Sequence, residues 1–362
     1  MGLQNIYLIS GFFFCLIAAT VAYGLIKRRH SDFSHSEIII FIPVLLTAIS
    51  YAGLAWDDSD IISNFSRLGY LAPLVASAIL ILASLRHFHS WQTTLIILGL
   101  SSLILIGFDL PTPLDAYFPR LANQLLIAGI WTVFCLALKT ANSSSGIVSL
   151  HIICPMIGIV ILFFIGAAPF ALGFEAVCII GAAVAFLMFN WPPAILKLTD
   201  NGAVVLAFLS GGILVYTGLE SSFASMFILV MLPLCEAVFA TLAKLTFNRQ
   251  TSGLNVCTAC SLAINSGLEP GIVAKHVFRV NLLMILFACF QVYAPNQFSI
   301  PLICAIVVFW QMYRLAHWNN LSSGLAETNR TVIAELKQNY SDFKKTLAKL
   351  TSQPSDPTDK KD

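Results

Sequence analysis

The sequence predicts an all-α, polytopic integral membrane protein, and three observations lead to that prediction. Of the 362 residues, 58% are hydrophobic and only 10% are charged, whereas soluble domains carry about 25% charged residues. The mean hydropathy is +0.84. Apolar stretches near the roughly 20 residues that cross a bilayer as a helix recur along the chain. A large soluble catalytic domain is therefore excluded, and a net charge of only +2 gives no indication of nucleic-acid binding.

About eleven stretches have the length and composition of transmembrane helices. They are predicted at residues 6–26, 38–56, 68–85, 91–108, 121–138, 147–165, 171–189, 203–219, 223–243, 277–293 and 300–315. The first stretch has no cationic segment before it and no small-residue cleavage site after it, so we expect a retained helix and not a signal peptide.

The distribution of charge predicts the orientation. If the N-terminus lies outside, 18 of the 20 Lys and Arg residues fall on the inner side, and only Arg67 and Arg120 fall outside. The acids Asp57, Asp58 and Asp60 fall outside. Positive charge concentrates on the cytoplasmic side of membrane proteins, so we expect a cytoplasmic C-terminus.

Three parts follow from the pattern: a transmembrane domain at 1–315, a cytoplasmic amphipathic helix at 316–351 and a disordered tail at 352–362. In the second part apolar residues recur at spacings of three and four from Ile333 to Leu350. This helix could lie on the membrane or on the protein's own inner face. Alternatively, it could form a short coiled coil with a second copy or with a partner enzyme.

Two charged clusters are candidates for ligand binding. Asp57-Asp58-Ser-Asp60 has the carboxylates that a divalent cation uses, but the predicted orientation places it in an outer loop. Arg86, His87 and His89 lie on the inner side, where they could bind a phosphate or anchor a helix at the interface. The Cys257-x-x-Cys260 pair lacks a second pair at zinc-site spacing, so it is weak evidence for a metal or redox site.

Two segments predicted on the inner side of the membrane and one acid within an apolar run are further candidates for a functional site. Residues 139–146 read as a capping turn with Asn142 in it, and residues 189–202 contain two prolines that break a helix before Asp200. The glycines that follow at 211 and 212 indicate close helix packing. Glu236 lies inside an apolar run, where a carboxylate needs a partner from the bundle interior and marks a functional-site hypothesis.

The segment from Ala185 to Gly202, Ala-Phe-Leu-Met-Phe-Asn-Trp-Pro-Pro-Ala-Ile-Leu-Lys-Leu-Thr-Asp-Asn-Gly, resembles a known signature. The polyprenyl-phosphate N-acetylhexosamine-1-phosphate transferases, which include phospho-N-acetylmuramoyl-pentapeptide transferase, have Phe-Leu-x-Phe-Asn-x-x-Pro-Ala-x-x-Phe-x-Gly-Asp-x-Gly at this spacing. Asn142 to Gly146 resembles the family's Asn-x-x-Asp-Gly, and Pro233 to Glu236 resembles its Pro-x-x-Asp. The resemblance implies an eleven-span fold in a bacterial-type inner membrane, with a polar inner-face cleft formed by the loops at 86–90, 139–147, 190–203 and 244–276.

Several of the family's motif residues are replaced in this chain. Arg86 and His87 stand where the family has an Asp pair, Ser145 replaces the Asp of Asn-x-x-Asp-Gly, and Cys257-Thr-Ala-Cys260 aligns with the family's His-x-His-His. Asp200 remains at the family's magnesium position. Replacing an acid pair by Arg-His favours binding of a phosphate but repels a metal ion.

The resemblance implies a protein of envelope-glycan assembly, with UDP-sugar and polyprenyl phosphate as its partners. We expect impaired catalysis, with the protein binding a nucleotide sugar, a lipid phosphate or a partner enzyme. The alternative is an active sugar-1-phosphate transferase that uses Mg²⁺ on Asp200, polar contacts from Asn142 and Asn190, support from Glu236, and Arg86, His87 and His89 for phosphate. A transporter or channel is disfavoured because few acids lie in the predicted spans.

Overall fold

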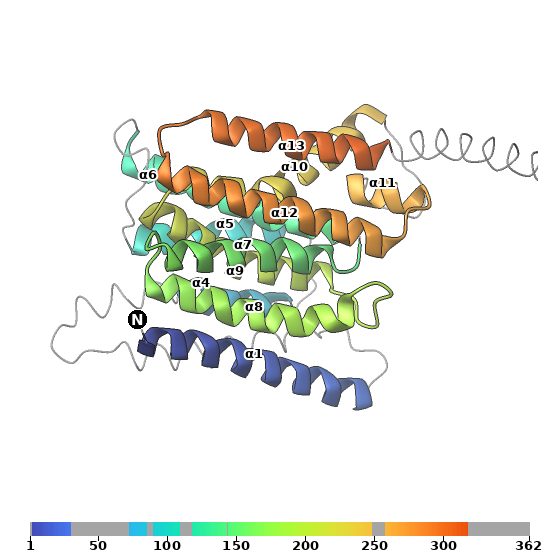
Figure 1. Cartoon of the computed structure of the whole chain (residues 1–362), viewed down its shortest axis with the longest axis horizontal. Helices are drawn as coiled ribbons and strands as arrows, with labels where there is room; N and C mark the ends of the chain where they lie inside the picture. Colours follow the sequence, from blue (N-terminus) through green and yellow to red (C-terminus); the bar gives the residue numbers. More distant parts are fainter. Residues whose placement is uncertain are drawn as a thin grey trace, which may run out of the picture.

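The computed structural model describes residues 2–29, 72–84, 90–108, 118–142, 144–247 and 258–317, and every regular element in these ranges is a helix. The helices run side by side in one bundle (Figure 1). Their bounds are α1 Gly2–Arg29, α4 Ala72–Ser84, α5 Ser90–Gly107, α6 Arg120–Ala141, α7 Ile147–Phe164, α8 Phe170–Asn190, α9 Asp200–Glu220, α10 Phe223–Phe247, α11 Ala259–Asn265, α12 Pro270–Tyr293 and α13 Ser299–Ala316.

The all-α, membrane-embedded class is confirmed. Within the described ranges eight helices are long and apolar enough to cross a membrane, and two shorter apolar stretches, Ala72–Ile81 and Trp91–Gly107, accompany them. Ten predicted spans coincide with helices to within a few residues at most ends. The predicted span at 38–56 lies outside the described residues, so the count of eleven stays a prediction. The tail helix at 316–351 and the end at 352–362 also stay predictions, because only residues 316 and 317 of these two segments are described.

The connection between α10 and α12 differs from the sequence prediction. A short helix, α11, forms inside the segment that we expected to be a polar loop, and Thr258 caps it by accepting a hydrogen bond from the Ser261 backbone N–H at 3.1 Å. Helix α12 begins at Pro270, seven residues before the predicted start at 277. Proline suits the first turn of a helix because its missing N–H has no helical partner there. The added residues are apolar except for Lys275 and His276, which made the apolar run seem to start at 277.

Helix α9 is the centre of the bundle and is almost entirely buried. It packs against α4, α6, α7, α8 and α10. A Cβ atom at Gly211 would lie 2.8 Å from the Trp131 ring of α6, which confirms the predicted close packing at this glycine. The Trp131 ring stacks on Phe208 at a centroid distance of 4.6 Å, and its Nε1 donates a hydrogen bond of 3.0 Å to the Phe208 carbonyl. The tryptophan therefore fixes α6 against α9 with both polar and apolar contacts.

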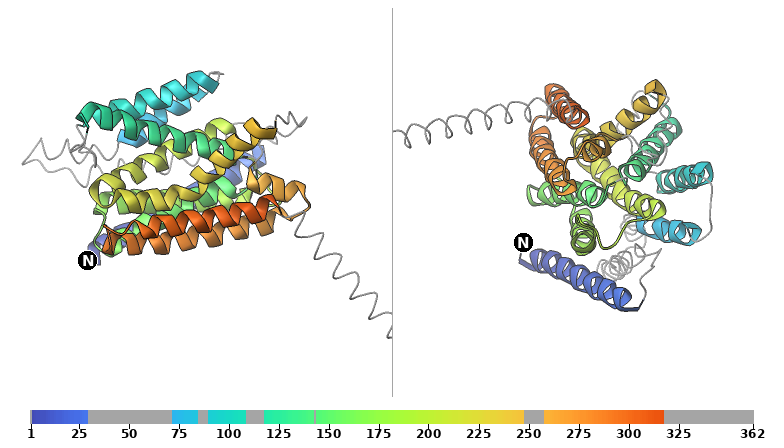
Figure 2. Two further views of the ribbon diagram at one scale, coloured as in Figure 1. Left: turned by 90° about the horizontal axis from the view of Figure 1, so that it is seen from above. Right: turned by 90° about the vertical axis from the view of Figure 1, so that its right-hand side faces the viewer.

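The outer helices expose apolar side chains. Helix α1 packs against α8 at the edge of the bundle, as the view along the helices shows (Figure 2, right). Its opposite side exposes Ile9, Phe13 and Ile17. Helix α13 likewise exposes Ile306, Phe309 and Trp310. Large exposed apolar side chains in such numbers are typical of a surface that faces lipid.

Candidate functional site

The ends of α6 and α9 meet through Asn142 and Asp200. Asn142 follows the last turn of α6, and its Nδ2 donates hydrogen bonds to the Leu198 carbonyl at 3.0 Å and to Asp200 Oδ1 at 3.1 Å. Thr199 caps α9 by accepting from the Gly202 N–H at 3.0 Å. Asp200 is exposed in the first helical turn, where the positive end of the helix dipole favours its negative charge.

Asn190 joins the same two segments from the buried side. Its side chain is 4% exposed. Its Oδ1 accepts a hydrogen bond of 2.6 Å from the Gly146 N–H, and its Nδ2 donates one of 2.7 Å to the Leu196 carbonyl. Gly146 has φ of +81° at the N-cap of α7, a conformation that favours glycine. We call Asn142, Gly146, Asn190 and Asp200 the loop cluster; it confirms that the segments predicted at 139–147 and 190–203 come together.

The loop cluster offers one described carboxylate to a ligand. Magnesium prefers an octahedral shell of oxygen ligands, usually with one or two carboxylates. In the described part of the chain no group of three or more His, Cys, Asp and Glu side chains is placed to hold a metal ion. One oxygen of Asp200 already accepts from Asn142. The described residues therefore do not fit a magnesium site by themselves.

A second polar cluster lies inside the bundle around Glu236. Its Oε2 lies 3.3 Å from His151 Nε2, and the two side chains are 2% and 0% exposed. Asn281 Nδ2 lies 3.5 Å from His151 Nδ1 and also donates to the Val277 carbonyl at 3.0 Å. The expected interior partner of Glu236 is thus His151. We call Glu236, His151, Asn281 and the adjacent Cys260 the core cluster, which joins α7, α10, α11 and α12.

Cys260 turns into the core cluster and away from solvent. It is 3% exposed and lies beside the Glu236 carboxylate. Burial, reinforced by the nearby carboxylate charge, raises the pKa of the Cys260 thiol well above its usual range. Such a thiol is neutral and unreactive. The Cys257 partner of the CxxC pair lies outside the described residues.

The core cluster contains two unsatisfied acceptors. Oε1 of Glu236 and Oδ1 of Asn281 are buried and have no hydrogen-bond partner among the described residues. The adjacent cavity has a volume of about 10 Å³, at the lower limit for one water molecule. No hydrogen bond or ion pair joins the core cluster to the loop cluster within the described ranges. The two clusters are therefore separate features.

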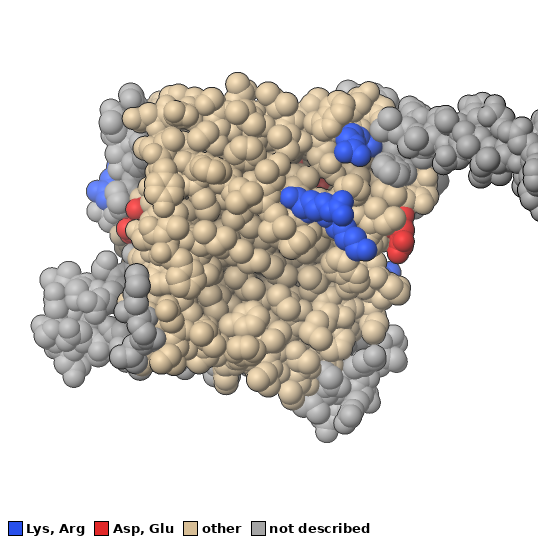
Figure 3. Space-filling model, viewed as in Figure 1, with Lys and Arg blue, Asp and Glu red and all other residues tan. Residues whose placement is uncertain are grey.

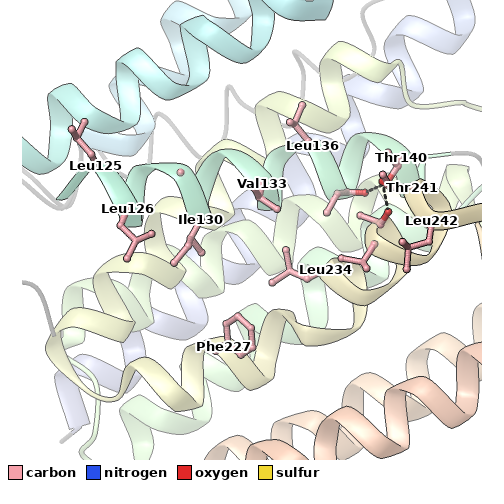
Figure 4. A pocket seen from close by; sticks show the side chains of 14 residues that line it. Leu125, Leu126, Ile130, Val133, Leu136, Thr140, Phe227, Leu234, Thr241 and Leu242 are labelled. Atoms are coloured by element: carbon pink, nitrogen blue, oxygen red, sulfur yellow. Dashed lines mark hydrogen bonds between the residues drawn. The ribbon is translucent and has the colours of Figure 1, made fainter. Parts of the chain in front are cut away.

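An apolar groove runs along the outside of α6 and α10 (Figure 4). Its volume is about 810 Å³. The lining residues are all apolar except two threonines: Leu125, Leu126, Gly129, Ile130, Val133, Leu136, Ala137, Thr140, Phe227, Leu234, Ala237, Val238, Thr241 and Leu242. Thr140 and Thr241 lie together at one end, where each hydroxyl donates to a carbonyl of its own helix at 2.7 and 2.8 Å. This end is the one from which the chain continues to Asn142.

Some of the predicted site residues are found in the clusters and others are not described. Asn142, Asn190 and Asp200 belong to the loop cluster, whereas Glu236 belongs to the core cluster. Arg86, His87 and His89, together with Asp57 and its neighbours, lie outside the described residues. Our reading of the sequence missed His151 and Asn281. His151 was detectable by the rule that indicated Glu236, since it is an ionisable residue in an apolar run.

Comparison with known proteins found no matching family model and no matching curated protein.

Proposed function

We propose that this membrane protein binds an isoprenoid lipid phosphate, with the chain in the groove between α6 and α10 and the phosphate at the Thr140 end. In this proposal it binds the lipid without transferring a sugar phosphate to it. The observation that carries the proposal is the shape of the groove, which is apolar along its length and polar at one end beside the loop cluster.

The dimensions of the groove suit a long single chain. Leu125 and Thr140 are separated by about 22 Å along α6, at 1.5 Å per residue. Leucine, valine and phenylalanine side chains line this length, so a hydrocarbon chain would bury apolar surface along it. The groove therefore suits a ligand with an extended apolar chain and a head group at one end.

The polar end of the groove can receive an anion. Lys139 lies in the last turn of α6, next to Thr140, and is half-buried. The Lys139 ammonium group is a suitable partner for a phosphate monoester. The Thr140 and Thr241 hydroxyls would have to release their helix carbonyls before they donate to it. Asp200 lies beyond them in the loop cluster, where its charge would oppose close approach of a phosphate unless a cation intervened.

Two features support impaired catalysis. Asp200 is the one carboxylate of the loop cluster, and the described residues do not complete a magnesium site around it. Cys260, at the end of the segment that resembles the family's His-x-His-His motif, is buried against Glu236 and does not face solvent. Transfer of a sugar phosphate requires neutralisation of a diphosphate, for which the described clusters provide few groups.

The test fills the groove without disturbing the bundle. A Cβ at Gly129, a lining residue, meets no atom within 4 Å, so Gly129→Leu places a side chain in the groove. Gly99→Leu on α5 is the matched control, because a Cβ there also meets open space outside the groove. Binding of undecaprenyl phosphate to the purified protein is measured by native mass spectrometry, with undecaprenol as the uncharged comparison.

We expect Gly129→Leu to lower undecaprenyl phosphate binding at least tenfold while Gly99→Leu leaves it unchanged. Lys139→Gln should weaken binding of the phosphate but not of the alcohol. Equal binding by the two glycine variants would show that the lipid does not use this groove, and equal affinity for phosphate and alcohol would exclude a phosphate site at its end.

An active transferase is the second candidate, and the exposure of Asp200 favours it. The carboxylate is accessible and oriented by Asn142, as a ligand-binding group must be. Activity predicts magnesium-dependent release of UMP from UDP-N-acetylhexosamines in the presence of undecaprenyl phosphate, and loss of that release in Asp200→Asn. Lipid binding without UMP release from any of these donors favours the binding role.

A further inference from the structure

A patch of positive charge lies on the outer surface of α12 and α13, apart from both clusters and from the groove. It consists of Lys275, His276 and Arg279 on α12 and Arg314 on α13, and we call it the basic patch. Lys275, Arg279 and Arg314 are exposed, and His276 is half-buried. Both arginines lie close enough to His276 to act on it electrostatically. In Figure 3 basic side chains gather over these two helices, toward the right-hand end of the bundle.

The two helices bring their charges to the same end of the bundle. Only residues 294–298 separate α12 from α13, so the helices form an antiparallel hairpin (Figure 1). The start of α12 and the end of α13 therefore meet, and Arg314 is in the last turn of α13. The hairpin adds Arg314 to the three residues of α12, from which it is distant in the sequence.

Acidic side chains are visible near the basic patch in Figure 3, but those of the described residues do not pair with it. No carboxylate in those ranges forms an ion pair with Lys275, Arg279 or Arg314. Glu269 is the nearest acid along α12; it stands at the N-cap position without a side-chain capping hydrogen bond, and its Oε1 lies 3.4 Å from the Cβ position of Gly271. Three like charges on one surface repel one another, and a bound anion would relieve that repulsion.

The depth of the patch indicates where such an anion would be. The apolar part of α12 starts at about residue 277, so Lys275 and His276 lie at the edge of the hydrocarbon region. Arg279 is within one turn of that edge, and its long side chain can extend to the interface. The phosphates of membrane lipids lie at this depth.

Exposed apolar side chains continue from the patch along both helices. On α12 these are Leu282 and Leu286, and on α13 they are Trp310 and Ile306. A ligand of the patch would therefore contact positive charge at one end and an apolar surface below it. That combination matches a phospholipid, whereas free phosphate would use only the charged part.

We propose that the basic patch binds the head group of an anionic diacyl phospholipid from the surrounding membrane, with its acyl chains along the α12–α13 seam. Basic residues between helices at the cytoplasmic side of a membrane are suitable for this purpose. The site is distinct from the isoprenoid groove, which lies between α6 and α10.

The experiment measures lipid binding to the full-length protein by native mass spectrometry, with phosphatidylglycerol and phosphatidylcholine of equal chain length. The test variant is Arg279→Gln combined with Arg314→Gln. The control is Arg120→Gln combined with Lys197→Gln, which removes the same charge away from the patch. Arg279→Lys combined with Arg314→Lys retains the charge. A loss of binding in this lysine pair would therefore come from misfolding and not from the removal of charge.

We expect the unmodified protein to bind phosphatidylglycerol at least tenfold more strongly than phosphatidylcholine. The glutamine pair should remove most of that preference, while the lysine pair and the control retain it. Loss of the preference in the control pair, or its persistence in the glutamine pair, would overturn the proposal. Inhibition by inorganic phosphate at micromolar concentration would also overturn it, because the site would then recognise a free anion.

The outcome is independent of the isoprenoid proposal. Gly129→Leu should leave phosphatidylglycerol binding unchanged, and the glutamine pair should leave undecaprenyl phosphate binding unchanged. Loss of both ligands in either variant would contradict two separate sites.

Discussion

The loop cluster and the core cluster each contain one carboxylate, but the two carboxylates have opposite surroundings. Asp200 is exposed at the start of α9 and has one described side-chain partner, Asn142. Glu236 is 2% exposed and is paired with His151 inside four packed helices. An accessible carboxylate with one partner can exchange that partner for a ligand. A buried one cannot do so without exposing a charge in the bundle interior, so we assign Glu236 to the stability of the fold.

The two clusters also connect different parts of the molecule. The loop cluster connects chain segments at the ends of helices, where the bonds of Asn190 fix the shape of a surface. The core cluster connects the interiors of α7, α10 and α12 and adds α11 through Cys260. Substitutions in the core cluster should therefore affect stability, and substitutions at Asp200 should affect ligands.

The largest effect is expected from Glu236→Leu. This variant leaves His151 buried without its partner, and breaking a buried pair in this way costs about 3–5 kcal/mol. Unfolding in detergent can be followed with a thiol-reactive dye, since six of the cysteines are buried in the folded protein. The double variant with His151→Leu should recover part of the loss because neither polar group remains. A Glu236→Leu protein as stable as the parent would show that the pair does not stabilise the bundle.

A smaller loss of stability is expected from Asn190→Ala. It removes one buried and one partly buried hydrogen bond and leaves the Gly146 N–H and the Leu196 carbonyl without a partner, at a cost of about 2 kcal/mol. Asn142→Ala is the matched comparison and should cost about 1 kcal/mol, because its bonds are closer to solvent. The same dye assay measures both, and a larger loss in Asn142→Ala would reverse the assignment of Asn190 as the main connection.

The smallest effect on stability is expected from Asp200→Asn. The exposed side chain keeps its shape, so the free energy of unfolding should change by less than about 0.5 kcal/mol. In the presence of EDTA this variant should bind undecaprenyl phosphate about two- to threefold more tightly, because a negative charge near the phosphate is removed. Weaker binding confined to buffers that contain magnesium would instead indicate a metal on Asp200 and favour the transferase.

Most of the fold was predictable from the sequence because each span carries its own signal. An apolar run of the length of the bilayer must form a helix, since backbone groups in hydrocarbon need internal hydrogen bonds. For that reason ten predicted spans coincide with helices, eight of which are long and apolar enough to cross a membrane. Helix α11 was missed because its seven residues are too few for a membrane span. The early start of α12 was missed because Lys275 and His276 interrupt the apolar run before residue 277.

The candidate sites were predictable only in part. Asn142 stood out in a predicted capping turn and Asp200 as the only acid of its loop, whereas Asn190 stood out through the resemblance to the transferase signature. Their pairing across 58 residues of sequence, from Asn142 to Asp200, depends on how α6 and α9 pack. The resemblance to the sugar-phosphate transferases rests on the residues alone and stays a prediction.

The sequence by itself determined that this is a helical membrane protein, because hydropathy is a local property of the chain. Only the tertiary structure decided that Glu236 pairs with His151, that α6 and α10 leave a groove, and that Arg279 and Arg314 share a surface. These features arise between helices that are distant in the sequence. Packing geometry determines which helices become neighbours, and the periodicity of a single sequence does not indicate this.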